Sequence, residues 1–111
     1  MTTLFDERER AYEAMFALDE ELRFIALARR NKRVGAWMCE RLALTGDEAA
    51  AYIRRLVEAG LGPDRDEVLV ARLRAELAGR GAQAEAEALP GLLMRYGAEA
   101  AREVRREARP T

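Results

Sequence analysis

The chain has 111 residues, which is the size of one ordinary domain. Its 19 basic and 20 acidic residues almost cancel, so the sequence predicts neither nucleic-acid binding nor direct insertion into a membrane. Histidine is absent and there is one cysteine, which removes the commonest general base and metal ligand and excludes an internal disulfide. We therefore expect no catalytic residues, no metal site and no enzyme activity.

The N-terminus is acidic and polar, which is unlike a secretion signal. No apolar run approaches the ~20 residues that a membrane-spanning helix needs. We therefore expect the protein in the cytoplasm, or in a membrane-associated complex that faces the cytoplasm.

Helical patterns occupy most of the chain and alternating strand patterns are missing, so an all-α fold is predicted. The first helical stretch runs from about Leu4 to Leu44. About forty residues is long for one globular helix, so we expect the stretch to divide near Asp19 into a protruding half and a docked half.

Three further helices are predicted. A capping-box pattern begins the first of them, which covers residues 45–59, and a break at 60–64 precedes a helix that ends at Gly79. In the last helix, Pro90 is either the first residue, or it lies inside a helix that starts near Glu85 and kinks it. Together these helices predict a small up-and-down bundle.

The N-terminal segment carries the most informative pattern. Phe5, Tyr12 and Phe16 recur at spacings of seven and four, which places them on one face of a helix. Charged residues surround them: Asp6, Glu7, Arg8, Glu9, Arg10 and Glu13. A helix this short is marginal alone in water, and such segments often fold by inserting into a partner's groove. The alternative is that the segment extends the first helix and packs on the body of its own chain.

A second apolar stripe lies on another side of the same stretch. Its members are spaced by four, three, four and three residues: Ala11, Met15, Leu18, Leu22 and Ile25. This stripe is either a further packing surface or a surface for self-association.

The densest basic run comprises Arg29, Arg30, Lys32 and Arg33. Such a run can be a solvated face, can form salt bridges between subunits, or can hold a phosphate or nucleotide. Consecutive residues of a helix point around its circumference, and no aromatic residues interleave with this run to stack bases. A solvated or salt-bridged face is therefore favoured, with phosphate binding as the alternative.

Several segments together resemble one known family. They are residues 6–14 (Asp-Glu-Arg-Glu-Arg-Ala-Tyr-Glu-Ala), 16–17, 19–24, 28–32, Gly35, Trp37, 44–46 (Leu-Thr-Gly) and 100–102 (Ala-Ala-Arg). In this order they are similar to the zeta-type inhibitor subunits of the alphaproteobacterial F-type ATP synthase. The resemblance spans essentially the whole chain and is most specific up to Trp37.

The resemblance implies a four-helix bundle over residues 19–111 and a protruding inhibitory arm over residues 1–18, whose order in the free protein it leaves open. It implies that the arm enters a catalytic alpha/beta interface beside the gamma stalk and blocks ATP hydrolysis. The implied partners are the alpha, beta and gamma subunits, on the cytoplasmic side of the inner membrane. The family also suggests ATP or ADP binding to the bundle, at residues that cannot be assigned. We expect a monomer when the protein is free.

Within the arm, the resemblance and the helical pattern predict two kinds of contact residue. Phe5, Tyr12 and Phe16 are the expected apolar anchors. The expected ion-pairing residues are Glu7, Arg8, Arg10 and Glu13.

The sequence also departs from the family pattern. Leu4 is an added residue before Phe5, and Met15, Leu18 and Ile25 stand where polar or basic residues are expected. Met15 removes a charge contact from the arm. The alternative function is therefore a zeta-like bundle with little inhibitory power, acting as a nucleotide-binding or structural regulatory module.

Overall fold

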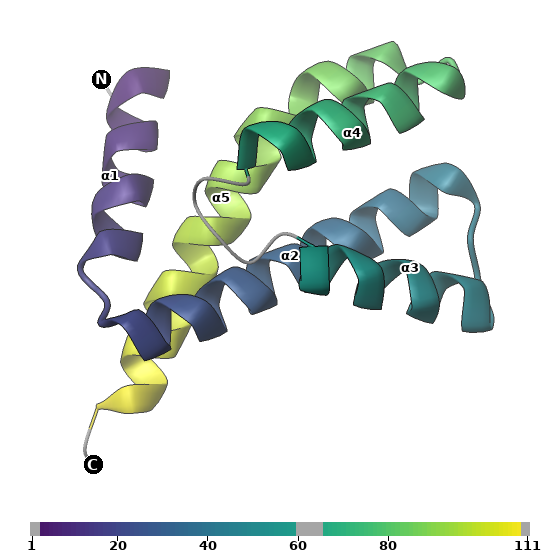
Figure 1. Ribbon diagram of the computed structural model, residues 1–111. Coiled ribbons are helices and arrows are strands. Elements are labelled where there is room, and N and C mark those ends of the chain that lie inside the picture. The colour runs from purple at the N-terminus through teal and green to yellow at the C-terminus, as the bar shows by residue number, and fades with distance from the viewer. Residues whose placement is uncertain (1–2, 60–65, 110–111) are drawn as a thin grey trace.

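The fold is entirely helical where it is described, as the sequence predicts. The computed structural model describes residues 3–59 and 66–109, and within these ranges the chain forms five helices and no strand (Figure 1). They are α1 (Leu4–Phe16), α2 (Glu20–Leu42), α3 (Gly46–Ala59), α4 (Asp66–Gly79) and α5 (Gln83–Ala108). The predicted break at residues 60–64 lies outside the described residues. None of the described helices is long and apolar enough to cross a bilayer.

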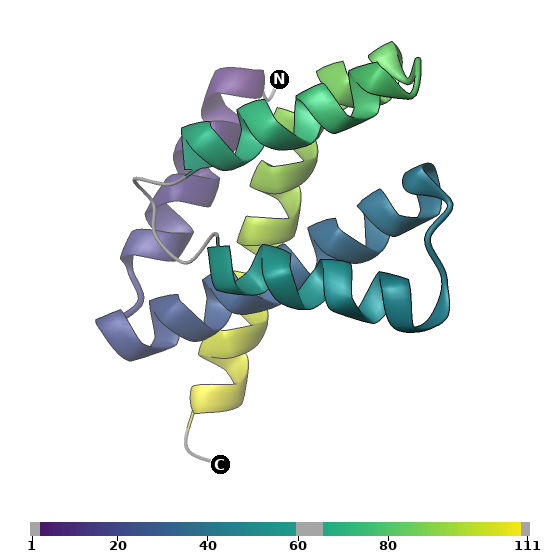
Figure 2. The ribbon, with the colours of Figure 1, turned by 45° about the vertical axis from the view of Figure 1, so that its right-hand side comes forward.

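Two antiparallel helix pairs make up the body. α3 folds back along α2, and α4 runs along the first half of α5, while the second half of α5 crosses α2 (Figures 1 and 2). α1 lies alongside α5. The predicted four-helix up-and-down bundle with a protruding arm is therefore not confirmed, because the two pairs splay apart and α1 rests on the body.

Two clusters of buried side chains hold the helices together. The main core lies between α2, α3, α4 and the first half of α5, and its fully buried members include Met38, Leu56, Leu73 and Leu89. A second cluster joins the end of α1 and the start of α2 to the last turns of α5. The single cysteine, Cys39, belongs to the main core, where burial raises the pKa of its thiol.

The long N-terminal stretch divides where the sequence predicts. Asp19 is the N-cap of α2, and its Oδ1 accepts a hydrogen bond from the Leu22 amide at 2.9 Å. At the other end of α2, Ala43 adopts a left-handed conformation with φ 56°, and the amides of Ala43 and Leu44 both donate to the Cys39 carbonyl. This turn reverses the chain, so that α3 runs back along α2.

α2 and α3 approach each other closely at Gly35. A Cβ atom on Gly35 would lie 3.1 Å from Ile53 Cγ1 and 3.3 Å from Ile53 Cα. Because one of these atoms belongs to the backbone of α3, the two helices cannot pack this closely with a larger residue at position 35.

α5 begins before Pro90, which decides between the two starts that the sequence leaves open. The helix runs from Gln83, so Pro90 lies inside it and cannot donate a hydrogen bond to the preceding turn. Ala86 and Leu89 are buried in the main core, and this packing offsets the cost of the proline. α5 changes direction between its first and second halves, as expected of a proline kink (Figures 1 and 2).

Candidate functional site

The predicted arm is a capped helix in this structure. Thr3 Oγ1 accepts a hydrogen bond from the Asp6 amide at 3.1 Å, while Asp6 Oδ2 accepts one from the Thr3 amide at 3.3 Å. This reciprocal capping box satisfies amides that have no partner within the helix. Asp6 and Glu7 also place negative charge at the positive end of the helix dipole. The local sequence thus favours a formed helix over residues 4–16.

One side of α1 packs on its own chain. Met15 and Leu18 are buried in the second cluster. The residues of α5 that meet them there are small or medium-sized: Ala100, Ala101 and Val104. The second apolar stripe is therefore mainly a packing surface within the chain, although Ile25 at its end stays 40% exposed.

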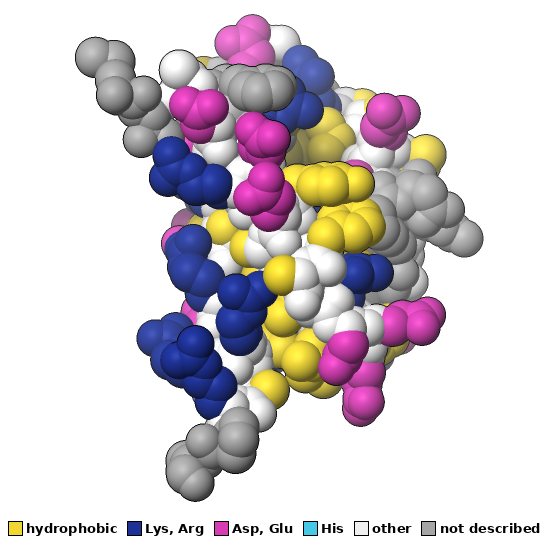
Figure 3. Space-filling view, turned by 90° about the vertical axis from the view of Figure 1, so that its left-hand side faces the viewer, with side chains coloured by type: hydrophobic (Ala, Val, Ile, Leu, Met, Phe, Trp, Pro, Cys, Tyr) yellow, Lys and Arg dark blue, Asp and Glu magenta, His cyan; other side chains and the backbone are white. Residues whose placement is uncertain are grey.

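The other side of α1 presents two aromatic rings to solvent. Tyr12 is 63% exposed and Phe16 is 43% exposed. Their ring centroids lie 4.2 Å apart with an interplanar angle of 28°, so the rings stack. Figure 3 shows hydrophobic side chains at the surface of this face of the molecule, between groups of charged ones. The structure therefore brings two of the three predicted anchors together on an accessible surface.

The remaining residues predicted to make contacts from the arm do not gather around the aromatic pair. Four of them are exposed along α1: Glu7, Arg8, Arg10 and Glu13. Phe5 lies in the first turn of α1, and its side chain is outside the described part of the structure. Arg8 lines the same groove as Tyr12 and Phe16, whereas Glu7 and Arg10 line a separate groove between α1 and α5.

Arg23 of α2 closes the C-terminal end of α1. Its guanidinium donates to the carbonyls of Leu18 at 3.0 Å, Phe16 at 3.2 Å and Met15 at 3.4 Å. Its Cζ also lies 4.7 Å from the centroid of the Phe16 ring. α1 has no basic residue in its own last turn, so Arg23 supplies the cation that the negative end of the helix dipole favours. Sequence reasoning missed Arg23, because no local pattern signals that it reaches back across the turn.

We expect Arg23→Ala to loosen α1 without unfolding the body. Each lost hydrogen bond contributes about 0.5–1.5 kcal/mol, so amides of α1 should exchange roughly tenfold to a hundredfold faster. Hydrogen–deuterium exchange measures this, and amides of α3 and α4 should keep their protection. Arg41→Ala is the matched control, because Arg41 also donates to a carbonyl and stacks on an aromatic ring, both belonging to Trp37. Faster exchange throughout the body of the Arg23 variant would contradict the expectation.

The basic run of α2 is used for pairing within the chain. Arg29 Nη1 lies 2.5 Å from Glu107 Oε2 and 3.2 Å from Glu103 Oε1, and Arg33 Nη2 lies 2.5 Å from Glu103 Oε1. The hydrogen bonds from Arg33 and Arg29 lower the pKa of the Glu103 carboxyl, and that from Arg29 lowers the pKa of Glu107. The predicted salt-bridged face is present, but its partners lie on α5 of the same chain instead of on another subunit.

Arg30 points in a different direction, toward the start of α4. It is nearly buried and makes two hydrogen bonds to the Asp66 carboxylate, at 2.8 and 3.0 Å, while its Nε donates to Asn31 Oδ1 at 3.0 Å. The pair lines a groove of about 280 Å³ that Tyr12 and Phe16 also line. Arg29 and Arg33 thus share the Glu103 carboxylate on α5, while Arg30 is paired with Asp66 at the start of α4.

These features define the chain as a small all-α protein whose capped N-terminal helix rests on the body and exposes an aromatic pair. Exposed aromatic and charged side chains of this kind suit contact with another protein. A family model described as ATPase inhibitor subunit zeta matches residues 1–103, so the chain belongs to that family, and the resemblance seen in the sequence is confirmed. Searches of curated proteins and of solved structures gave no significant match.

Proposed function

We propose that the chain is a non-catalytic regulatory subunit of an F-type ATP synthase. In this proposal it blocks ATP hydrolysis by inserting α1 at a catalytic alpha/beta interface, next to the gamma stalk. Membership of the family of ATPase inhibitor zeta subunits supports an inhibitory role. The observation that carries the choice of α1 is the stacked pair of Tyr12 and Phe16, exposed on a helix that is already capped.

A helix can stop a rotary cycle by stabilising one conformation of an interface that must open and close. Its effect on the cycle is set by the difference between its affinities for the open and closed states. Aromatic side chains often supply most of the binding energy in such contacts, because they bury a large area with few rotatable bonds. In the proposed complex, Tyr12 and Phe16 enter the interface as one stacked unit. The charged arm residues pair at its rim: Glu7, Arg8, Arg10 and Glu13.

The proposed arm is residues 1–18 and the proposed body is residues 19–111. Interactions that hold the described part of the arm to the body include Met15 and Leu18 in the second cluster, the hydrogen bonds from Arg23, and one from Arg105 Nη2 to the Ala14 carbonyl at 3.4 Å. Insertion of the whole helix breaks those that residues of α1 make. The binding free energy of α1 in the partner's interface must therefore exceed the free energy that holds α1 on its own body.

The proposal also fixes the partners and the location. The arm contacts the alpha, beta and gamma subunits, and the protein is therefore held at the cytoplasmic face of the inner membrane through the synthase. In the free state it is a monomer. Nucleic acid is not among its partners.

Replacing Tyr12 and Phe16 together by alanine should raise the half-inhibitory concentration by about a hundredfold, since truncating an interface anchor typically costs more than 1 kcal/mol. The measurement is ATP hydrolysis by the catalytic sector of the cognate synthase, titrated with the chain. Both rings lie outside the two buried clusters, so the fold should persist, and circular dichroism checks this. Deleting residues 2–18 is a less clean test, because it also removes Met15 and Leu18 from the second cluster.

Phe24→Ala is the matched control for this experiment. Phe24 is a phenylalanine that is 55% exposed, and it lies on α2, outside the arm. Its replacement should leave inhibition unchanged. Unchanged inhibition by the Tyr12/Phe16 variant would contradict the arm mechanism.

A second candidate function is a zeta-like module that binds the synthase with little inhibitory power. The burial of Met15 against α5 favours it, because this packing holds the arm on the body. Tight binding to the catalytic sector with undiminished hydrolysis would select this function. Titration with ATP and ADP, followed through backbone amide shifts, tests its nucleotide-binding form.

A further inference from the structure

Four arginines form a stripe along the exposed side of α5. Arg95, Arg102, Arg106 and Arg109 follow one another at spacings of seven, four and three residues, which places them on one face of a helix. All four are exposed. Within residues 3–59 and 66–109, none of their side chains takes part in a hydrogen bond or salt bridge. We call these four residues the α5 arginine stripe.

Nearby carboxylates of α5 offset only part of the charge of this stripe. Glu103 and Glu107 pair with Arg29 and Arg33 of α2 at 2.5–3.2 Å. Glu99 lies 3.8 Å from Arg33 and also lines a groove with Arg95 and Arg102, and Arg106 helps to lower the pKa of the Glu107 carboxyl. The stripe therefore presents a local positive charge on a chain whose net charge is only -1.

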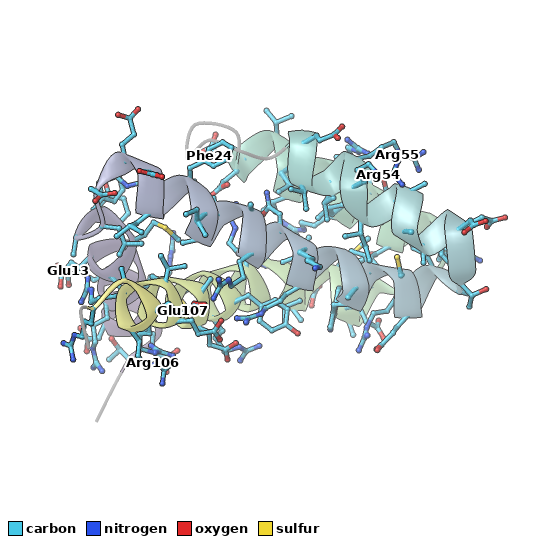
Figure 4. The ribbon with its side chains drawn as sticks, turned by 90° about the horizontal axis from the view of Figure 1, so that it is seen from below. Glu13, Phe24, Arg54, Arg55, Arg106 and Glu107 are labelled. Atoms are coloured by element: carbon cyan, nitrogen blue, oxygen red, sulfur yellow. The ribbon has the colours of Figure 1, made fainter. Side chains whose placement is uncertain are left out.

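The stripe lies beside the arm. Arg95 and Arg102 share a groove of about 300 Å³ with residues of α1, which are Glu7, Arg10 and Ala11. Figure 3 shows a column of Lys and Arg side chains on the face of the molecule that carries α1. In Figure 4, Arg106 and the arm residue Glu13 lie at the same end of the molecule. Positive charge is therefore concentrated where the arm joins the body.

The short link between arm and body restricts which surface can face a partner. Residues 17–19 separate α1 from α2, and three residues span at most about 10 Å. Leu18 is itself packed among Ala100, Ala101 and Val104 of α5. When α1 is seated in a groove of another protein, the second half of α5 must therefore lie close to the rim of that groove.

We propose that the α5 arginine stripe is a second docking surface, which binds an acidic patch on the protein that receives the arm. This inference rests on the proposed function, in which that protein is the catalytic sector of the synthase. The stripe attracts the body to the correct region before α1 inserts, so it acts mainly on the rate of association. The aromatic pair of the arm then determines how slowly the complex dissociates.

The stripe fits an acidic protein surface better than an anionic membrane. A helix that lies in a membrane interface needs an exposed apolar face beside its basic residues. The apolar face of α5 is buried in the two clusters, and the exposed large hydrophobic residues of the described chain lie on other helices. Electrostatic contact without apolar insertion is the expected mode of binding.

The test compares two charge reversals of equal size. Arg102→Glu with Arg106→Glu reverses the stripe, and Arg54→Glu with Arg55→Glu reverses an exposed arginine pair on α3, which Figure 4 places far from Arg106. Association with the catalytic sector is measured by stopped flow at about 0.05 M and about 0.3 M salt. The stripe variant should associate about tenfold more slowly at low salt and lose most of its salt dependence, and the α3 variant should stay within about twofold of the native chain.

The outcomes separate this inference from the proposed function. Normal inhibition and normal association by the stripe variant would overturn the inference and leave the arm mechanism standing. Equal slowing by both reversals would also overturn it, because net charge alone would then act. Loss of inhibition in the Tyr12/Phe16 variant with its association rate retained supports both. If the stripe variant melts early, Arg102→Gln with Arg106→Gln keeps the helix and should give a smaller slowing in the same direction.

Binding to lipid vesicles is the last measurement of the test. Phosphatidylcholine vesicles with about 30% phosphatidylglycerol present a strongly anionic surface. We expect no measurable binding of the native chain at about 0.15 M salt. Binding that the stripe variant loses would assign the stripe to lipid and overturn the inference.

Discussion

Replacing Leu73 by alanine should lower the free energy of unfolding by about 3 kcal/mol. Leu73 is fully buried in the main core. Removing a buried leucine side chain costs the transfer free energy of its carbons together with the energy of the cavity left behind, about 2–5 kcal/mol in total. α4 buries three leucines, at positions 69, 73 and 77, so its attachment to α5 depends strongly on each of them. Denaturation in urea, followed by circular dichroism, measures the loss.

The control for Leu73→Ala lies on the same helix. Val68 is 71% exposed, and its replacement by alanine should change the free energy of unfolding by less than about 0.5 kcal/mol. Small domains have total stabilities of about 5–15 kcal/mol, so the Leu73 variant should unfold at a clearly lower temperature than the Val68 variant. A change as small as that of the Val68 variant would mean that α4 contributes little to the core.

Asp66→Ala should destabilise the protein by about 3 kcal/mol. The change removes the carboxylate that accepts two hydrogen bonds from Arg30, a residue that is only 5% exposed. The guanidinium then remains nearly buried beside Asn31 without its anionic partner, and a buried charge without a partner is costly. Thermal and chemical denaturation both measure the effect.

Glu67→Ala separates the salt bridge from the helix dipole. Asp66 and Glu67 both lie in the first turn of α4, where each acid interacts favourably with the helix dipole by about 0.3–1 kcal/mol. Glu67 is exposed, so its removal should cost only the dipole interaction. If Asp66→Ala and Glu67→Ala lowered the free energy of unfolding equally, the salt bridge between Arg30 and Asp66 would add no stability.

The boundaries of α2 and α3 follow from local chemistry, which is why the sequence predicts them well. Asp19 is an N-cap residue just before an apolar stripe, and the capping pattern at Thr45 precedes α3 by one residue. The C-terminal end of α2 is harder to predict from the sequence, because Ala43 takes the left-handed conformation that glycine usually adopts there. The start of α5 could not be chosen, since Pro90 fits a helix start better than a helix interior. Only the burial of Ala86 and Leu89 in the main core shows that α5 starts before Pro90.

The candidate site could be predicted only where its residues are close in sequence. Tyr12 and Phe16 stack because they are four residues apart on one helix, and periodicity reveals this. The partners of the basic run are much farther along the chain, on α4 and α5, so spacing within the run could not identify them. The same limit applies to the docking of α1. A small apolar stripe permits packing on the body or on a partner, and only the position of Ala101 and its neighbours shows that α5 offers a matching surface.

The caps at the two ends of α1 have a kinetic consequence for any encounter. A segment that folds on contact loses conformational freedom during binding and can search many shapes before it locks. In α1, Thr3 and Arg23 fix both ends of the helix before a partner arrives. Under the proposed arm mechanism, the aromatic pair therefore meets the partner in a single geometry, and we expect mutual orientation instead of folding to set the rate of productive collisions.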